Sequence, residues 1–425
     1  MRSPYNWIFI KYILIDLLAP PGLACQKVVR RELTSPLLLH RNTVQQQTQY
    51  RFHIVKAEAL VFRAPIDIPV RTSFGTMLNR PALLIRLTDV DGQVGWGEVW
   101  CNFPSVGAEH RARLLSSVLG PLLCGKAWDS PQACFDALTA QTHILGLQTG
   151  EPGPLAQVIA GVDIALWDLV GKRMGLPIWQ LLGGERTVAV YASGIHPNDA
   201  PALVEAKTKE GYTAFKLKVG FDDDQDEQAV RQLRDQIGTD RVLMVDANQG
   251  WSVERARSMI AKLEPYELAW IEEPVSADTP WASWRALAEG TMQRLAAGEN
   301  LRGAAAFTRA HAEGGIRVIQ PDIGKWGGFS GCVPVGRHAN EQGHWFCPHW
   351  LGAGIGLRAS MHLKAAVGGP GHVEVDANPN PLRDLLAAPA LRVQDGTVSL
   401  MDEPGLGVEP LLDAARPYLV PVLAE

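Results

Sequence analysis

The 425-residue sequence predicts an α/β fold, in which a parallel (β/α) barrel follows a smaller α+β domain. After residue 184, short apolar β-type runs alternate with amphipathic helices, and most of these runs end in an ionisable residue. Before residue 184 the pattern differs, because an antiparallel meander is followed by several helices. The length is more than one ordinary core needs, so a barrel with an accessory domain is expected.

Residues 1 to 53 are expected to form a disordered leader or an over-extended start. The apolar run Ile8 to Leu18 is interrupted by Lys11 and Asp16, and it is much shorter than the ~20 residues of a membrane span. The Gln-rich stretch Gln45 to Gln49 follows it. We therefore leave this segment out of the fold prediction.

Residues 54 to 183 are expected to form the α+β domain, with Asp91-Gly92 as a hairpin turn. Alternating apolar residues predict the strands Val55 to Phe62, Ala82 to Leu87 and Val94 to Val99. Apolar residues at helical spacing predict the helices His110 to Leu119, Gln132 to His143 and Ala156 to Arg173.

Residues 184 to 380 contain eight β-type runs separated by helices, the repeat that closes into a parallel barrel. Residues 381 to 425 are expected to return to the front domain. The eight runs are Val188 to Ala192, Ala214 to Val219, Val242 to Val245, Leu268 to Ile271, Leu295 to Ala297, Val318 to Ile319, Trp345 to Cys347 and Val373 to Val375.

The charge balance argues against nucleic acid or membrane as a partner, because 40 Lys and Arg oppose 45 Asp and Glu for a net charge of -5. A small dissolved substrate fits better. The six cysteines form no C-x-x-C pair and no zinc-ligand spacing, so no disulfide framework is indicated and a cytoplasmic location is expected.

Active-site groups of such barrels lie at the C-terminal ends of the strands. From the second run onward, the strand ends carry Lys216 and Lys218, Asp246, Glu272, Glu299, Asp322, His349 and Glu374. Asp246, Glu272 and Glu299 would converge on one point, where a cation has to offset their repulsion. All-oxygen ligation suits Mg²⁺, with Mn²⁺ possible. The alternative is that they pair with basic residues, which these three strand ends do not supply.

Lys216 and Lys218 lie two residues apart on a strand, so their side chains share a face. Like-charge proximity and burial would lower a lysine pKa and make a general base. The alternative is a basic pair that binds a carboxylate, and both roles are compatible. Asp322 and His349 end neighbouring strands, so the carboxylate can orient the imidazole for acid/base chemistry.

With these residues in view, the chain from about Ile54 onward resembles the mandelate racemase and muconate lactonizing branch of the enolase superfamily. That superfamily's Lys or His base with Mg²⁺ is a known pattern. The resemblance implies a modified TIM barrel with an N-terminal capping domain that the C-terminal tail completes. It is carried by Phe215-Lys216-Leu217-Lys218, Val245-Asp246-Ala247-Asn248, Trp270-Ile271-Glu272-Glu273-Pro274, Ala297-Gly298-Glu299-Asn300, and Gln320-Pro321-Asp322 followed by Lys325-Trp326-Gly327-Gly328.

The resemblance implies that Lys218 is the base on one face of the substrate and Lys216 its carboxylate-contacting neighbour. His349, paired with Asp322, would be the acid/base on the opposite face, and Glu374 would hydrogen-bond the carboxylate. The Asp322 and His349 pair indicates the mandelate racemase-like group, because lactonizing-type relatives place a lysine on the sixth strand. The same resemblance assigns the metal to Asp246, Glu272 and Glu299.

Asn248 occupies a position near substrate in this group, whereas the resemblance assigns Lys325 no role. The segment Pro69 to Thr76 resembles the mobile loop that closes over the barrel mouth and selects substrate. Arg71 and Phe74 are its candidate substrate contacts, with simple surface exposure as the alternative.

The expected reaction is Mg²⁺-dependent removal of the α-proton of a hydroxy-carboxylate through an enediolate, followed by dehydration of an acid sugar to a 2-keto-3-deoxy acid. Racemisation or epimerisation of a 2-hydroxy acid is the first alternative, and a non-catalytic module with this fold is a remote one. Relatives commonly assemble as homo-oligomers, and this is also expected here.

Overall fold

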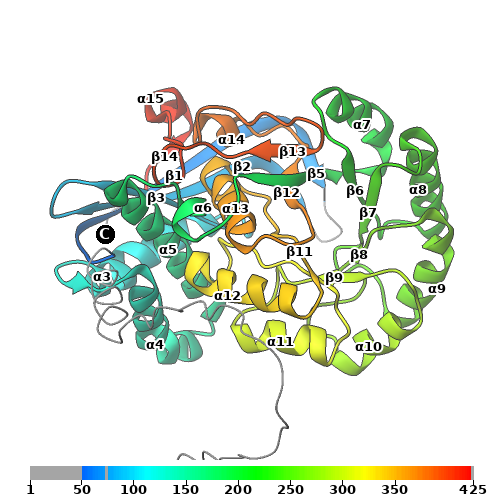
Figure 1. The fold of residues 1–425 in the computed structure, drawn as a ribbon, viewed down its shortest axis with the longest axis horizontal. Helices are drawn as coiled ribbons and strands as arrows, with labels where there is room; N and C mark the ends of the chain where they lie inside the picture. Colours follow the sequence, from blue (N-terminus) through cyan, green and yellow to red (C-terminus); the bar gives the residue numbers. More distant parts are fainter. Residues whose placement is uncertain (1–49, 72–74, 423–425) are drawn as a thin grey trace, which may run out of the picture. The chain divides into compact units, whose positions relative to one another are not determined.

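The computed structural model describes residues 50–71 and 75–422, whose strands form two β-sheets (Figure 1). The first, antiparallel sheet belongs to the capping domain, and the second is the sheet of the barrel. The fold predicted from the sequence is confirmed. The expected leader lies mostly outside the described residues.

The capping sheet has the strand order β14-β1-β2-β3, and β4 also pairs with β1. Its strands are β1 Phe52–Arg71, β2 Thr76–Asp89, β3 Val94–Val99, β4 Ala127–Trp128 and β14 Leu419–Val420. The helices of this region are α2 Gly107–Leu114, α3 Gly120–Leu123, α4 Pro131–Thr149, α5 Pro152–Met174 and α6 Ile178–Leu181, with a π-helical turn at Leu115–Leu119. The three predicted strands and three predicted helices are all present.

Helix α5 packs directly against β3, and glycines in the strand permit this approach. A Cβ atom on Gly97 would lie 2.0 Å from the carbonyl oxygen of Gly161 in α5. The helix is long and apolar enough to cross a membrane by composition alone, but 72% of that stretch is buried inside the protein. It is therefore a core helix of the capping domain.

The barrel sheet has the strand order β11-β10-β9-β8-β7-β6-β5-β12, and these strands are parallel. The barrel closes between β11 and β12, where the Glu374 N–H donates to the Pro348 carbonyl at 3.3 Å. The strands are β5 Thr187–Ile195, β6 Ala214–Lys218, β7 Val242–Asp246, β8 Ile271–Glu272, β9 Leu295–Ala297, β10 Val318–Ile319, β11 Trp345–Phe346 and β12 Val373–Asp376. All eight predicted strands are therefore present.

Helices surround the barrel (Figure 1). They are α7 Ala200–Lys209, α8 Asp223–Ile237, α9 Val253–Leu263, α10 Trp281–Glu289, α11 Ala304–Ala312, α12 Gly328–Glu341 and α13 Gly354–Val367. Short 3-10 turns lie at Pro197–Asp199, Glu264–Tyr266 and Arg416–Tyr418. Phe215 and Leu217 of β6 belong to the core shared with the helices, whereas Lys216 and Lys218 face the interior. Strand alternation thus places both lysines inside the barrel.

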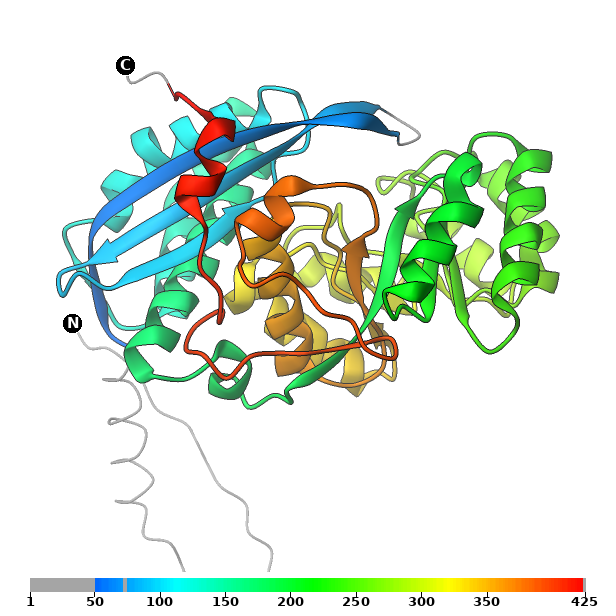
Figure 2. The same ribbon diagram turned by 90° about the horizontal axis from the view of Figure 1, so that it is seen from above.

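The C-terminal segment contains α14 Pro381–Leu385, β13 Thr397–Ser399 and α15 Leu412–Ala415. It ends beside the capping sheet, because β14 pairs with β1 (red beside blue in Figure 2). The predicted return to the front domain is therefore observed. The pairing of β13 with barrel strand β5 was not predicted.

Two boundaries differ from the prediction. Strand β1 starts at Phe52, before the predicted strand start at Val55, because Phe52 is buried and pairs with Trp128. It also runs on to Arg71, since β1 and β2 extend together as a long hairpin arm. The described parts of the loop expected from Pro69 to Thr76 thus lie at the ends of these two strands, and residues 72–74 lie outside the described residues.

Candidate active site

A cavity of about 220 Å³ lies at the C-terminal ends of the barrel strands, between the barrel and the capping domain. This is small beside the 300–1,000 Å³ of typical drug-sized sites, so a compact ligand fits it. Its barrel wall includes Lys218, Asn248, Glu299, Lys325 and His349. Its capping wall includes Trp100, Asn102 and Phe103.

The two lysines of β6 are buried among carboxylates. Lys216 Nζ lies 2.6 Å from Glu272 Oε1, 2.9 Å from Glu374 Oε1 and 3.6 Å from Asp246 Oδ2. Lys218 Nζ donates to Asp246 Oδ2 at 2.6 Å and to Asn248 Oδ1 at 2.9 Å. One network therefore joins β6, β7, β8 and β12 inside the barrel.

His349 lies between two acids. Its Nδ1 is 2.7 Å from Asp322 Oδ2, as the strand-end spacing predicted, and its Nε2 is 2.5 Å from Glu299 Oε2. Asp322 is fixed in turn, because its Oδ1 accepts the backbone N–H groups of Gly324 and Lys325, each at 2.9 Å. Asp322 thus holds the imidazole at Nδ1, while Nε2 contacts Glu299, which also lines the cavity.

The lysine pKa values contradict the expectation from the sequence. Burial lowers the pKa of Lys218, but the carboxylates of Asp246 and Glu272 together outweigh this effect, and the pKa lies above its ordinary value. The pKa of Lys216 is raised for the same reason, chiefly by Glu272 and Glu374. The prediction of lowered values was wrong for this arrangement, because it counted the second lysine and omitted the acids.

The acids respond in two ways. Burial raises the pKa of Glu272 to about 7 and that of Glu273 to about 8, in the second case with help from the Glu299 charge. Burial also disfavours the charged form of Glu299, yet His349 and Lys325 hold its pKa well below the ordinary value. Burial works against charged His349 as well, but Glu299 and Glu374 raise its pKa well above normal.

The predicted metal ligands lie in one region but do not form a ready site. Asp246 and Glu272 are register partners in β7 and β8, and the Glu299 charge acts on Asp246. Within residues 50–71 and 75–422, no three His, Cys, Asp or Glu side chains are positioned to hold a metal ion. Instead, Glu272, Asp246 and Glu299 pair with Lys216, Lys218 and His349, which is the alternative of pairing with basic residues.

The donor set nevertheless fits a divalent ion. Carboxyl groups outnumber cationic groups in this network, with six against four. The carboxyl groups are Asp246, Glu272, Glu273, Glu299, Asp322 and Glu374, and the cations are Lys216, Lys218, Lys325 and His349. An excess of two carboxyl groups over cations, all of them oxygen donors, matches the chemistry of Mg²⁺.

Of the two candidate loop residues, only Arg71 lies within the described residues. Arg71 is exposed at the end of β1, and its charge acts on His196 beyond β5. It is not among the residues around the 220 Å³ cavity. Phe74 lies outside the described residues.

Sequence reasoning missed several groups of the site. Glu98 of β3 accepts the backbone N–H of Ala353 at 2.6 Å and of Gly356 at 2.8 Å, and burial raises its pKa to about 7. It therefore joins the capping domain to the segment that follows His349. Gln320 donates to Glu272 Oε2 at 2.6 Å. Of these two residues, only Gln320 could have been found from the sequence, because it lies two residues before Asp322 and side chains two apart in an extended chain point the same way.

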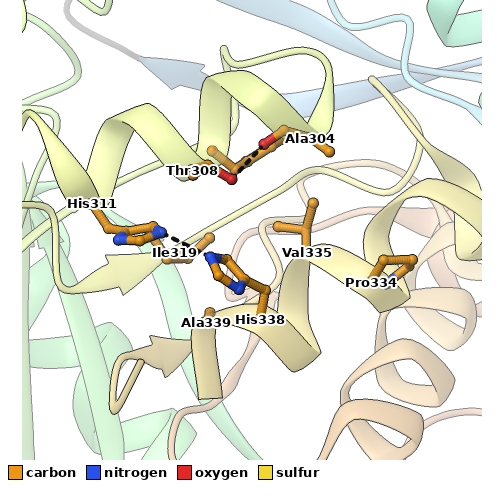
Figure 3. A pocket seen from close by; sticks show the side chains of 9 residues that line it. Ala304, Thr308, His311, Ile319, Pro334, Val335, His338 and Ala339 are labelled. Carbon is orange, nitrogen blue, oxygen red and sulfur yellow. Dashed lines mark hydrogen bonds between the residues drawn. The ribbon is translucent and has the colours of Figure 1, made fainter. Parts of the chain in front are cut away.

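A second cavity, of about 310 Å³, lies between α11 and α12 (Figure 3). His311 and His338 face each other there, with 3.2 Å between their Nε2 atoms. The other lining residues are mostly apolar, and none belongs to the charged network. The acid/base groups therefore identify the 220 Å³ cavity as the candidate active site.

Two family models match the chain. Residues 54–183 match the mandelate racemase/muconate lactonizing enzyme N-terminal domain, and residues 199–414 match the enolase C-terminal domain-like family. A D-galactarolactone cycloisomerase of Agrobacterium fabrum is 30% identical over 84% of this chain and 96% of its own. A D-galactonate dehydratase of Cronobacter sakazakii is 32% identical over 66% of this chain and 74% of its own.

Solved structures agree with these matches. A mandelate racemase/muconate lactonizing enzyme from Bordetella bronchiseptica has a TM-score of 0.82 and 51% identity, covering 87% of this chain and 99% of its own. An enolase from Bradyrhizobium, solved with magnesium and mandelic acid, has a TM-score of 0.77 and 30% identity, covering 88% and 99%. Magnesium is thus present in a solved structure that shares this fold.

Proposed function

Because this chain belongs to the mandelate racemase/muconate lactonizing enzyme family of the enolase superfamily, we propose that it dehydrates an acid sugar to a 2-keto-3-deoxy acid. The reaction begins with removal of the proton beside the substrate carboxylate, through an enediolate intermediate. The D-galactonate dehydratase among the relatives supports this choice.

One observation carries the proposal: Lys218 and His349 reach the same small cavity from separate strands. Lys218 ends β6 and His349 follows β11, and β5 and β12 lie between these strands, so the two side chains approach from different sides. A base on one side and an acid on another are what elimination of water across a carbon–carbon bond requires.

The chemical difficulty is the charge that accumulates on the substrate. Removing the α-proton places a second negative charge on the carboxyl oxygens, and preorganised cations and donors have to stabilise it. Lys216 is fully buried beside the cavity-lining Lys218, with its ammonium held by Glu272 and Glu374. It is therefore placed to meet this charge without rearrangement.

Asp246, Glu272 and Glu299 would hold the divalent ion. That ion, Mg²⁺ or Mn²⁺ with the same oxygen ligands, would supply positive charge that offsets the charge on the substrate. With Asp246 engaged as a ligand, Lys218 would no longer pair with this carboxylate. Burial and the nearby Lys216 ammonium would lower its pKa, as base catalysis needs.

Lys218 would take the α-proton, and the carbon–hydrogen electron pair would enter the enediolate. His349 would donate its Nε2 proton to the β-hydroxyl, the carbon–oxygen bond would break, and water would leave. The enol product then tautomerises to the 2-keto acid. Asp322 keeps His349 oriented throughout, because the 2.7 Å contact lies at the opposite nitrogen, Nδ1.

The test is to incubate the full chain with Mg²⁺ and a panel of pentonic, hexonic and aldaric acids. We expect a 2-keto acid from at least one member, and no product from Lys218→Met or His349→Asn. Absence of both keto acid and α-deuterium exchange in D₂O across the panel would contradict the proposal.

Racemisation or epimerisation is the second candidate, because His349 could return a proton to the α-carbon from its own side of the cavity. The mandelic acid in the Bradyrhizobium structure favours testing it. α-Deuterium exchange in D₂O without keto acid would select this reaction over dehydration.

A further inference from the structure

We propose that Lys325, with Trp100 of the capping domain packed against it, is a positioning residue that fixes one carboxylate oxygen of Glu299. The other oxygen is thereby left to exchange between His349 and the divalent ion. This inference rests on the proposed function, in which Glu299 is a metal ligand.

The two oxygens of Glu299 have separate partners. Lys325 Nζ lies 3.3 Å from Oε1, and His349 Nε2 lies 2.5 Å from Oε2. Asn300 Nδ2 also donates to Oε1, at 3.1 Å. A metal ion that takes Oε2 therefore releases His349 for catalysis, while the contacts at Oε1 keep the carboxylate in place.

The position of Lys325 is fixed by the same turn that fixes Asp322. Its backbone N–H donates to the Asp322 carbonyl at 3.1 Å and to Asp322 Oδ1 at 2.9 Å. The aspartate that orients His349 thus also sets the start of the lysine side chain. Only 11% of that side chain is exposed, so the ammonium has little freedom to leave Glu299.

Trp100 holds the ammonium from the capping side. Lys325 Nζ lies 4.6 Å from the Trp100 ring centroid, within the range of a cation–π contact. The Trp100 backbone N–H also donates to the Gly324 carbonyl at 3.3 Å, which ties the end of β3 to the turn after β10. The capping domain thereby reaches Glu299 through one side chain.

Two competing roles for Lys325 predict different results. As a mere neighbouring positive charge it would repel the metal ion, so its removal would tighten Mg²⁺ binding. As a substrate contact on the cavity wall, its removal would raise KM and leave Mg²⁺ binding unchanged. As a positioning residue, its removal weakens Mg²⁺ binding.

The experiment is calorimetric titration of Mg²⁺ into the full chain without substrate. We expect Lys325→Met to weaken binding by about tenfold or more, as for other groups that orient metal ligands. Trp100→Leu keeps the ammonium and loses the ring, so we expect about a threefold loss. Lys325→Arg, which keeps a charged donor, should recover part of the affinity.

Lys126→Met is the matched control. Lys126 Nζ also lies 4.6 Å from a tryptophan ring centroid, that of Trp128, but this pair is in the capping domain away from the acids. We expect unchanged Mg²⁺ binding. If Lys325→Met does not fold, Trp100→Leu against Lys126→Met supplies the same comparison.

Unchanged or tighter Mg²⁺ binding in Lys325→Met and Trp100→Leu would overturn the inference and leave the proposed function standing. A wild-type chain that binds no Mg²⁺ would contradict the proposed function and the inference together. Weaker binding in both variants, with Lys126→Met unaffected, would support the positioning role.

Discussion

Asp322→Asn is expected to abolish dehydration while sparing removal of the α-proton. In the wild type, Asp322 Oδ1 accepts two backbone N–H groups at 2.9 Å, and Oδ2 contacts His349 Nδ1 at 2.7 Å. Those two donors will keep the amide oxygen of asparagine at the Oδ1 position. The amide NH₂ group then faces Nδ1, which must become a hydrogen-bond acceptor.

The consequence is a neutral imidazole with its proton on Nε2. The wild-type His349 has a pKa raised by Glu299, Glu374 and Asp322, against the effect of burial, and is therefore a protonated acid. A neutral ring donates its proton to a leaving hydroxyl far less readily. A comparable Asp→Asn change in a triad lowers kcat about 10⁴-fold, or ~5 kcal/mol of transition-state stabilisation.

The assay measures two products of one reaction in D₂O. Keto acid formation should fall by about 10⁴-fold in Asp322→Asn. α-Deuterium exchange, which depends on Lys218, should stay within about tenfold of the wild type. Asp163→Asn is the control, because Asp163 is also a buried carboxylate that accepts a backbone N–H, from Ser330 at 3.0 Å. Parallel loss of exchange and keto acid in Asp322→Asn would refute the division of roles.

Three further predictions concern pH, metal and packing. Burial lowers the pKa of His362 from 6.5 to about 3, so protonation of this residue favours the unfolded chain once the pH falls below 6.5. Between pH 7 and pH 5 the free energy of unfolding from urea titrations should fall by about 2 kcal/mol more in the wild type than in His362→Gln. An equal difference between the two proteins at both pH values would contradict this. EDTA should abolish turnover and added Mg²⁺ should restore it. At a hundredfold excess of Mg²⁺ over its Kd, the free energy of unfolding should rise by about 2.7 kcal/mol. Activity that persists in EDTA would argue against a metal. Gly97→Ala should destabilise the fold by about 3 kcal/mol, because the new Cβ would lie 2.0 Å from the Gly161 oxygen. Gly153→Ala is the control, because its Cβ meets nothing closer than 3.5 Å and should leave the stability nearly unchanged. Thermal denaturation of both variants measures the difference.

The strands were predictable where burial imposes a simple period. In β6, Phe215 and Leu217 pack on helices while Lys216 and Lys218 face the interior, and this alternation is visible in the sequence. The extension of β1 to Arg71 was not predictable in this way. The arm it forms with β2 is held by backbone pairing, and strand pairing leaves no periodic signal at exposed positions such as Ile68.

The site shows the same division between position and pairing. Strand ends can be read from the sequence, and three of the residues predicted there, Lys218, Glu299 and His349, line the cavity at the mouth of the barrel. Glu98 was not found, because its partners Ala353 and Gly356 are more than 250 residues away and donate backbone N–H groups, which carry no sequence signal. The predicted lowering of the lysine pKa values was wrong for a related reason, since these values depend on which acid each lysine contacts.

That pairing bears directly on the metal. Buried carboxylates need a partner, and Lys216, Lys218 and His349 supply one for Glu272, Asp246 and Glu299. These cations cannot satisfy the whole network, because the carboxyl groups outnumber them by two, and burial raises the pKa values of Glu272 and Glu273 to about 7 and 8. A divalent ion would remove this excess and free both proton-transfer groups together. Under the proposed function, metal binding and activation of the base and acid would therefore be coupled through the same three carboxylates.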